Sequence, residues 1–239
     1  MRLLLFDVDG TLLRCGPQVR PILADALREV FGVCGELDGF DFSGKTDQQI
    51  VLELLAAAGV PKRRIRDGLA RVRALYLERL EALLDRDRMS VLPGVQDLLE
   101  ALAVQRERAA LGLLTGNWRA GARIKLSRFG LERYFAFGAF GDDGVERSEL
   151  PPVALERAAR ATGRDFAPEE ALIVGDSVRD VECGRAHGIP VLAVATGWTP
   201  GERLAAAGAD RVVDSLAGLA DELVATPWPP ASDARAAAG

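Results

Sequence analysis

Five short apolar segments recur along this chain, separated by stretches with helical spacing. Most of them are apolar at nearly every position, which is typical of strands buried on both faces of a parallel sheet. Strands that alternate with helices predict an α/β fold with a doubly wound parallel sheet and right-handed crossovers. The predicted strands are Leu3–Val8, Ala109–Thr115, Ala171–Gly175, Val191–Ala195 and Arg211–Val213, and the predicted helices of this part are 94–106, 118–129, 152–162, 178–187, 201–207 and 215–224.

The segment after the first strand has a different pattern, with helical spacing and no strand. Its last helix should bury one face, because its apolar residues, from Ile65 to Leu83, lie three or four positions apart. We expect this helical insert to form a small cap domain over a Rossmann-like core. The predicted cap is 16–88, with helices at 17–31, 46–58 and 62–87; the core is 1–15 and 89–225, followed by a disordered tail at 226–239.

Carboxylates stand at the end of the first predicted strand, where Asp7 and Asp9 precede Gly10. Like charges this close need a compensating partner, and carboxylate and carbonyl oxygens are ligands of Mg²⁺. An Asp-Gly turn after an edge strand would also explain them. Thr115 and Asp176 likewise end predicted strands, and ligands of such sheets bind beyond the carboxyl ends of the strands. We therefore expect these side chains to meet in one crevice.

Two of these strand ends lead into a polar turn and a helix. Thr115, Gly116 and Asn117 offer a hydroxyl and backbone N–H groups that can hold an anion, although an ordinary turn with a helix cap has the same residues. Asp176 and Asp180 lie one helical turn apart, and an N-cap followed by a residue that favours the helix dipole is the alternative. Because both turns follow strands of one sheet, the pattern favours a functional site.

The composition argues against several function classes. The 239 residues carry a net charge of −5, which argues against a nucleic-acid or membrane partner, and no apolar stretch could span a bilayer. Three widely spaced cysteines without metal-ligand spacing favour reduced thiols in a cytoplasmic protein. We interpret His187, the only histidine, as a helix C-cap, so the chain offers little support for Ser-His-Asp or Cys-His mechanisms.

Three motifs resemble those of the haloacid dehalogenase superfamily, in its phosphatase branch. DVDGT begins at Asp7, LLTGN contains Thr115, and GDSVRD contains Asp176 and Asp180; they match the family's first, second and fourth motifs. The resemblance extends from Leu3 to about residue 223, the helical insert resembles the family's cap, and the most similar members are phosphoglycolate phosphatase-like. An aspartate at the place of Asp9 argues against dehalogenation, because the family's dehalogenases lack it.

The resemblance implies a Mg²⁺-dependent phosphatase that acts on a small phosphorylated metabolite, with phosphoglycolate as the lead substrate. Asp7 would be the nucleophile that forms an aspartyl phosphate. Asp9 would be the general acid for the leaving alcohol and then the base that activates water. The implied metal ligands are Asp7, the Asp9 carbonyl and Asp176 with support from Asp180, and the implied phosphate ligands are Thr115, Gly116 and Asn117.

One motif departs from the family's pattern, because no lysine stands in the segment 142–152, before the helix that precedes GDSVRD. Arg147 is the obvious cationic substitute, since its fork of donors suits phosphate, although it could also be a solvent-facing arginine. Lys125 is the runner-up. At 1.5 Å per helical residue it should lie roughly 10 Å beyond Thr115, a long reach for its side chain.

The cap should determine the substrate. The glycine loop at Ser43–Asp47 is expected to face the crevice, where Lys45 could bind a substrate carboxylate; a solvated lysine beside an N-capping residue is the alternative. Trp118 could line the pocket or pack in the core. Phosphomutase or pyrophosphatase chemistry on the same scaffold stays open, as does a non-catalytic phosphate-binding regulatory module. The sequence specifies neither the physiological substrate nor the oligomeric state.

Overall fold

The computed structural model describes residues 1–225 and 228–229. Within these residues a six-stranded parallel sheet has the order β5-β4-β1-β6-β7-β8. The order reverses between β1 and β6, and a reversal of this kind is where doubly wound sheets bind ligands. The predicted doubly wound α/β fold is therefore confirmed. The strands are β1 (Arg2–Phe6), β4 (Ala109–Leu114), β5 (Phe137–Ala139), β6 (Ala171–Gly175), β7 (Val191–Val194) and β8 (Arg211–Val213).

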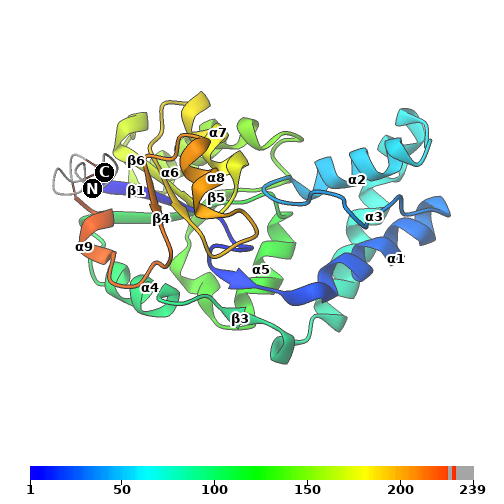
Figure 1. Ribbon diagram of the computed structural model, residues 1–239, viewed down its shortest axis with the longest axis horizontal. Coiled ribbons are helices and arrows are strands. Elements are labelled where there is room, and N and C mark those ends of the chain that lie inside the picture. Colours follow the sequence, from blue (N-terminus) through cyan, green and yellow to red (C-terminus); the bar gives the residue numbers. More distant parts are fainter. Residues whose placement is uncertain (226–227, 230–239) are drawn as a thin grey trace.

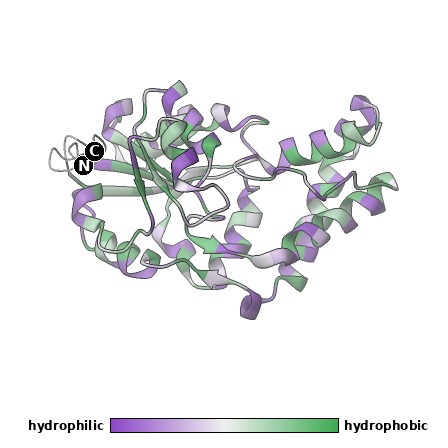
Figure 2. Cartoon of the chain, in the orientation of Figure 1, coloured by the Kyte–Doolittle hydropathy of each residue, from purple (hydrophilic) through white to green (hydrophobic). Residues whose placement is uncertain are grey.

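Helices cover both faces of the sheet (Figure 1). Successive side chains of a strand point to opposite faces, so Leu4 and Phe6 join one hydrophobic cluster whereas Leu3 and Leu5 join the other. Both faces of β1 are buried, which explains its continuous apolar run, visible as green strands in Figure 2. The first face packs against α4 (Val95–Ala103), α5 (Arg119–Ser127) and α9 (Ala220–Leu223), and the second against α6 (Leu150–Thr162), α7 (Val178–Ala186) and α8 (Gly201–Ala206).

Three helices between β1 and β4 extend away from the sheet (Figure 1). The last of them, α3, buries the predicted face through Ile65, Val72, Tyr76 and Leu80. Leu83 was expected on that face but is 60% exposed, because the helix ends there and Leu84 turns inward instead. The three helices are α1 (Val19–Phe31), α2 (Asp47–Ala57) and α3 (Lys62–Leu83).

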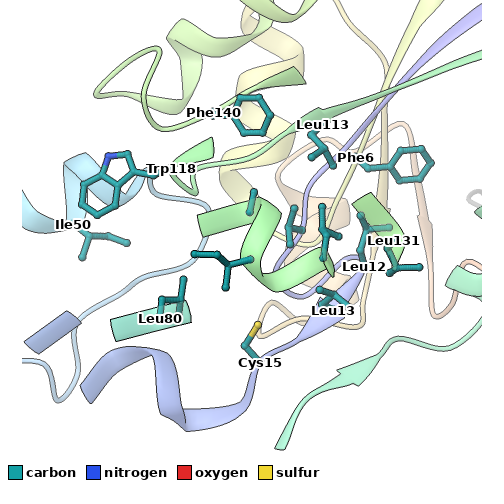
Figure 3. Close-up of a cluster of buried hydrophobic side chains, with 14 of the residues drawn as sticks. Phe6, Leu12, Leu13, Cys15, Ile50, Leu80, Leu113, Trp118, Leu131 and Phe140 are labelled. Carbon is teal, nitrogen blue, oxygen red and sulfur yellow. The ribbon is translucent and has the colours of Figure 1, made fainter. Parts of the chain in front are cut away.

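A short two-stranded ladder connects these helices to the rest of the chain. Its strands, β2 (Leu13–Arg14) and β3 (Ser90–Val91), pair antiparallel and flank the predicted cap. Figure 3 shows Ile50 and Leu80 of the helical insert in the same buried cluster as Leu13. Each such side chain contributes about 1.5–3 kcal/mol when it is fully buried. The insert and the sheet therefore share one hydrophobic core.

Some predicted elements differ from the observed ones. Strand β5 was missed because it has only three residues and contains Gly138. The helix predicted at 215–224 is reduced to α9. The tail predicted to be disordered lies outside the described residues, apart from Trp228 and Pro229; Trp228 is 8% exposed and packs in the core.

Two smaller findings bear on the environment of the chain. The three cysteines, Cys15, Cys34 and Cys183, are free thiols, as expected. No helix in the described part of the chain is both long and apolar enough to cross a membrane.

Candidate active site

The carboxyl ends of β1 and β6 bring three buried aspartates together. Asp7 follows β1 and Asp176 follows β6, while Asp180 lies in the first turn of α7. Carboxylate oxygens of the three lie within 4.8 Å of one another. The backbone of Asp7 continues the sheet, because its N–H donates to the carbonyl of Val174 at 2.9 Å. The sheet itself thus places a buried acidic cluster at its reversal point.

Close backbone approaches enclose Asp176. A Cβ on Gly10 would lie 2.4 Å from Asp176 Oδ2, and a Cβ on Gly197 would lie 1.6 Å from the same oxygen. Gly10 also has a positive φ of 87°, which only glycine adopts readily. Thr11 Oγ1 donates to Asp176 Oδ1 at 3.0 Å, a role that the sequence interpretation did not assign to it. Two glycines and one hydroxyl therefore fix this carboxylate.

The acidic cluster is electrostatically unfavourable in the absence of a cation. Burial raises the pKa of Asp7 to about 6; the charge of Arg147 opposes this shift, whereas Asp180 and Asp9 add to it. Burial also raises the pKa of Asp176 well above its usual range, with further repulsion from Asp7 and Asp180. Buried oxygen donors whose negative charge Arg147 compensates only in part fit a divalent cation such as Mg²⁺.

Asp180 is held by the chain itself. The backbone N–H of Ser177 donates to Asp180 Oδ2 at 3.0 Å, and the Ser177 hydroxyl donates to the same oxygen at 2.6 Å. The other oxygen, Oδ1, accepts from Arg147. With these partners Asp180 is suited to orient Arg147 and Ser177.

Arg147 lies at the centre of the acidic cluster and is buried instead of facing solvent. Its Nη2 is 3.4 Å from Asp7 Oδ1, bonds Asp180, and donates to the carbonyl of Leu114 at 2.8 Å. The residue comes from the short turn Arg147–Glu149 before α6, the place where the family's lysine was expected. A permanent positive charge therefore stands beside Asp7.

Lys125 is a second buried cation, and it contacts Asp9 instead of the three clustered aspartates. Its Nζ is 2.6 Å from Asp9 Oδ2 and 2.6 Å from Asn117 Oδ1. The expected separation of roughly 10 Å from the turn after β4 was wrong for the side chain, because side chains of a helix lean toward its N-terminus and α5 begins only at Arg119. Burial by itself would raise the pKa of Asp9. The charge of Lys125 and the hydrogen bonds from Lys125 and Asn117 outweigh burial and lower this pKa.

The turn after β4 is covered by the segment before α2. The Thr115 hydroxyl accepts from Asn117 Nδ2 at 2.9 Å, and the Asp47 N–H donates to the carbonyl of Gly116 at 2.7 Å. A Cβ on Gly116 would lie 2.1 Å from the carbonyl oxygen of Lys45. Only glycine allows the two backbones to approach so closely.

The side chains of Lys45 and Trp118 have partners other than the three clustered aspartates. The ammonium of Lys45 pairs with Glu53 and lies 4.2 Å from the centre of the Phe40 ring. Trp118 is buried and packs edge-on against Tyr76, so it belongs to the core. A substrate carboxylate would therefore compete with Glu53 for Lys45.

Comparison with known proteins agrees with this geometry. Residues 4–194 match the family model described as haloacid dehalogenase-like hydrolase. The chain belongs to this family. The predicted assignment to the phosphatases of the haloacid dehalogenase superfamily, and to an enzyme, is thereby confirmed. A plasmid-encoded phosphoglycolate phosphatase of Cupriavidus necator is 33% identical over 220 residues, which cover 90% of each chain. That of Synechococcus elongatus is 30% identical over 222 residues, covering 92% of this chain and 95% of the relative.

Solved structures of other proteins share the fold. A predicted phosphatase from Clostridium acetobutylicum superposes with a TM-score of 0.69 at 19% identity, covering 93% of this chain and 98% of that one. CbbY from Rhodobacter sphaeroides in complex with phosphate gives a TM-score of 0.66 at 22% identity, covering 92% and 96%. At these identities the likeness concerns the fold alone.

Asp47 is a residue of this hydrolase that the sequence interpretation considered only as a possible helix N-cap; Thr46 is the N-cap instead. Its Oδ2 accepts from the backbone N–H of Trp118 at 2.8 Å, which fixes the start of α5 against α2. Burial raises the pKa of Asp47 to about 6, against the opposing charge of Lys125. The available signal was its position after Thr46, which caps α2, but nothing in the sequence indicated the partner across the crevice.

Proposed function

We propose that this phosphatase hydrolyses a small phosphomonoester, with phosphoglycolate as its lead substrate, through an aspartyl phosphate on Asp7 and with Mg²⁺ as its cofactor. The single observation that carries the proposal is the environment of Asp7. Its carboxylate is buried at the reversal point of the sheet, 3.4 Å from the Arg147 guanidinium, with Asp9 two residues further along. The choice of phosphoglycolate rests on the relatives named above.

In this proposal an oxygen of Asp7 attacks phosphorus as the ester P–O bond breaks. The electron pair of that bond goes to the leaving alkoxide, which takes a proton from Asp9. A water then gives its proton to Asp9 and attacks phosphorus, and inorganic phosphate leaves with Asp7 restored. The lowered pKa of Asp9 makes it a ready proton donor once it is protonated, and the negative charge of a bound phosphate nearby favours that protonation.

The carboxylates of Asp7 and Asp176 and the carbonyl of Asp9 would hold Mg²⁺, with Asp180 in support. When bound, the ion would offset repulsion between the phosphate oxygens and these carboxylates. Arg147 would stabilise charge on the phosphoryl oxygens from the other direction. Thr115, Gly116 and Asn117 would orient phosphate at the turn after β4, which requires the segment before α2 to move aside, since Thr115 is fully buried.

Phosphate release should depend on Mg²⁺ and should be fastest with phosphoglycolate. The test is release of inorganic phosphate from phosphoglycolate, sugar phosphates, 5′-nucleotides and pyrophosphate, with Mg²⁺ and then with EDTA. Release from pyrophosphate alone, or an isomerised sugar phosphate without release, would assign the site to pyrophosphatase or mutase chemistry. No release from any compound by a folded protein would favour the non-catalytic binding module.

Protonation of Asp7 by itself should make Mg²⁺ bind about tenfold more weakly at pH 5 than at pH 7.5. The pKa of Asp7 in the metal-free protein is about 6, so at pH 5 most of its carboxyl groups must release a proton before the ion binds. Calorimetric titrations in two buffers of different ionisation enthalpy measure both the affinity and the protons released. Equal affinity at the two pH values, without proton release, would contradict the assignment of Asp7 as a ligand.

A further inference from the structure

Two buried cations lie among the candidate site residues, and each contacts different carboxylates. Among the described residues the buried basic side chains are Arg2, Lys125 and Arg147. Arg2 bonds backbone carbonyls away from the site, at Ala225 and Glu169. Arg147 contacts the acidic cluster, and Lys125 contacts Asp9. The reaction proposed above uses the charge of Arg147 and leaves Lys125 without a role.

The contacts of Lys125 hold one oxygen of Asp9. Lys125 Nζ and Asn117 Nδ2 reach the same oxygen, Oδ2, at 2.6 and 2.7 Å. The position of the Lys125 ammonium is further fixed, because its Nζ also donates to Asn117 Oδ1. The three groups form a closed triangle of hydrogen bonds. The second carboxylate oxygen of Asp9, Oδ1, receives neither of these two donors.

Burial differs sharply between the two partners. The side chain of Lys125 is 4% exposed, whereas that of Asp9 is 40% exposed. Tyr76, Cys15 and Asp47 lie near enough to Lys125 to act on its charge, so the ammonium is enclosed on several sides. A fixed buried donor thus anchors a carboxylate that is itself partly exposed. An exposed ion pair would lack this rigidity.

We propose that Lys125 is a positioning residue for Asp9: it fixes Oδ2, so that Oδ1 faces the oxygen of the leaving group. The inference rests on the proposed function, because it concerns the proton transfer from Asp9. As the P–O bond breaks, its electron pair goes to the leaving oxygen, and the proton moves to that oxygen from Asp9 Oδ1. Water later returns a proton to the same atom. Lys125 itself exchanges no proton in either step.

The test compares two aryl esters of similar size with different leaving groups. Phenol is a poor leaving group that needs a proton, whereas 4-nitrophenol is a better one that needs it less. For Lys125→Met, kcat/KM should fall about 10²-fold with phenyl phosphate and less than about tenfold with 4-nitrophenyl phosphate. This ratio reports the transfer to Asp7 and excludes the later hydrolysis of the aspartyl phosphate, which is the same for both esters. Arg147→Met should lower kcat/KM for both esters by the same factor, because phosphoryl charge develops with either leaving group.

Two further variants complete the comparison. Lys62→Met, an exposed lysine at the start of α3, should leave both rates and their ratio unchanged. Lys125→Arg keeps a cation at the site and should retain a ratio close to that of the wild type. If circular dichroism finds Lys125→Met unfolded, Lys125→Gln takes its place, with a smaller change of ratio in the same direction.

The outcomes separate this inference from the proposed function. A larger loss with phenyl phosphate supports a positioning role for Lys125. Equal losses with both esters, or no loss with either, would overturn that role while leaving the phosphatase mechanism intact. A folded wild-type protein that releases phosphate from no ester would contradict the proposed function, and the assignment of Lys125 with it.

Discussion

Asp7→Asn is expected to lower the rate of phosphate release by at least about 10⁴-fold and to raise the thermal midpoint of the metal-free protein. The rate falls because an amide oxygen is a poor nucleophile toward phosphorus. The midpoint rises because the substitution removes one of three buried like charges. The pKa of Asp7 is raised to about 6, so its ionised form lowers the free energy of unfolding by roughly 3 kcal/mol at neutral pH.

The sign of this stability effect depends on pH. A carboxyl whose folded-state pKa is raised contributes stability below its unfolded pKa and loses it as the pH rises through the folded value. The advantage of Asp7→Asn should therefore be full above about pH 6 and absent below about pH 4.

Phosphate release and thermal melts at pH 4 and pH 7.5 measure the two effects of Asp7→Asn. Asp67→Asn, an exposed position on α3, is the matched control and should change neither quantity. A wild-type rate of phosphate release from purified Asp7→Asn would exclude Asp7 as the nucleophile. An unchanged midpoint at pH 7.5 would mean that the charge of Asp7 is already compensated in the metal-free protein.

Arg147→Met should destabilise the metal-free protein by about 3–5 kcal/mol, the cost of leaving buried charges without their partner. Asp7 and Asp180 both lose their contact with the guanidinium. Phosphate release should fall about 10²-fold, because a preorganised charge near the phosphoryl group is removed. Mg²⁺ should recover part of the stability, since it supplies positive charge to the same carboxylates.

Denaturant unfolding with and without Mg²⁺ measures the stability of Arg147→Met. Arg160→Met, on the exposed face of α6, is the control; it removes a surface pair with Glu156 and should cost no more than about 1 kcal/mol. A cost of that small size at Arg147 would show that the buried pair is not needed for stability. A deficit that Mg²⁺ does not reduce would argue against a cation at this cluster.

The sequence predicted most of the sheet because burial on both faces leaves a strong local trace. Strands β6 and β8 were predicted with their observed bounds, and the remaining predicted strands within two residues. Strand β5 left no such trace, since three residues with a central glycine carry no periodicity. Its position at the edge follows from pairing with β4, which is a long-range contact.

The candidate site, like the sheet, was predictable from the sequence only in part. Asp7, Asp9 and Asp176 were predicted as site residues because they stand at the ends of apolar runs, a pattern that is local in the chain. The reach of Lys125 was misjudged because spacing along a helix says nothing about the direction of a long side chain. Contacts across the crevice, such as Asp47 with Trp118, depend on how α2 meets α5 and have no counterpart in the local pattern.

The central place of β1 in the sheet has a consequence for biosynthesis. Leu3 of β1 pairs with Ala110 of β4 on one side and with Ala171 of β6 on the other. The strand that leads into the proposed nucleophile is synthesised before both of its neighbours, and β6 emerges from the ribosome only after β4 and the segment that follows it. Until then its apolar residues have an open edge, a state that favours association with other chains. Asp7 and Asp176 can therefore become neighbours only after β6 has been synthesised.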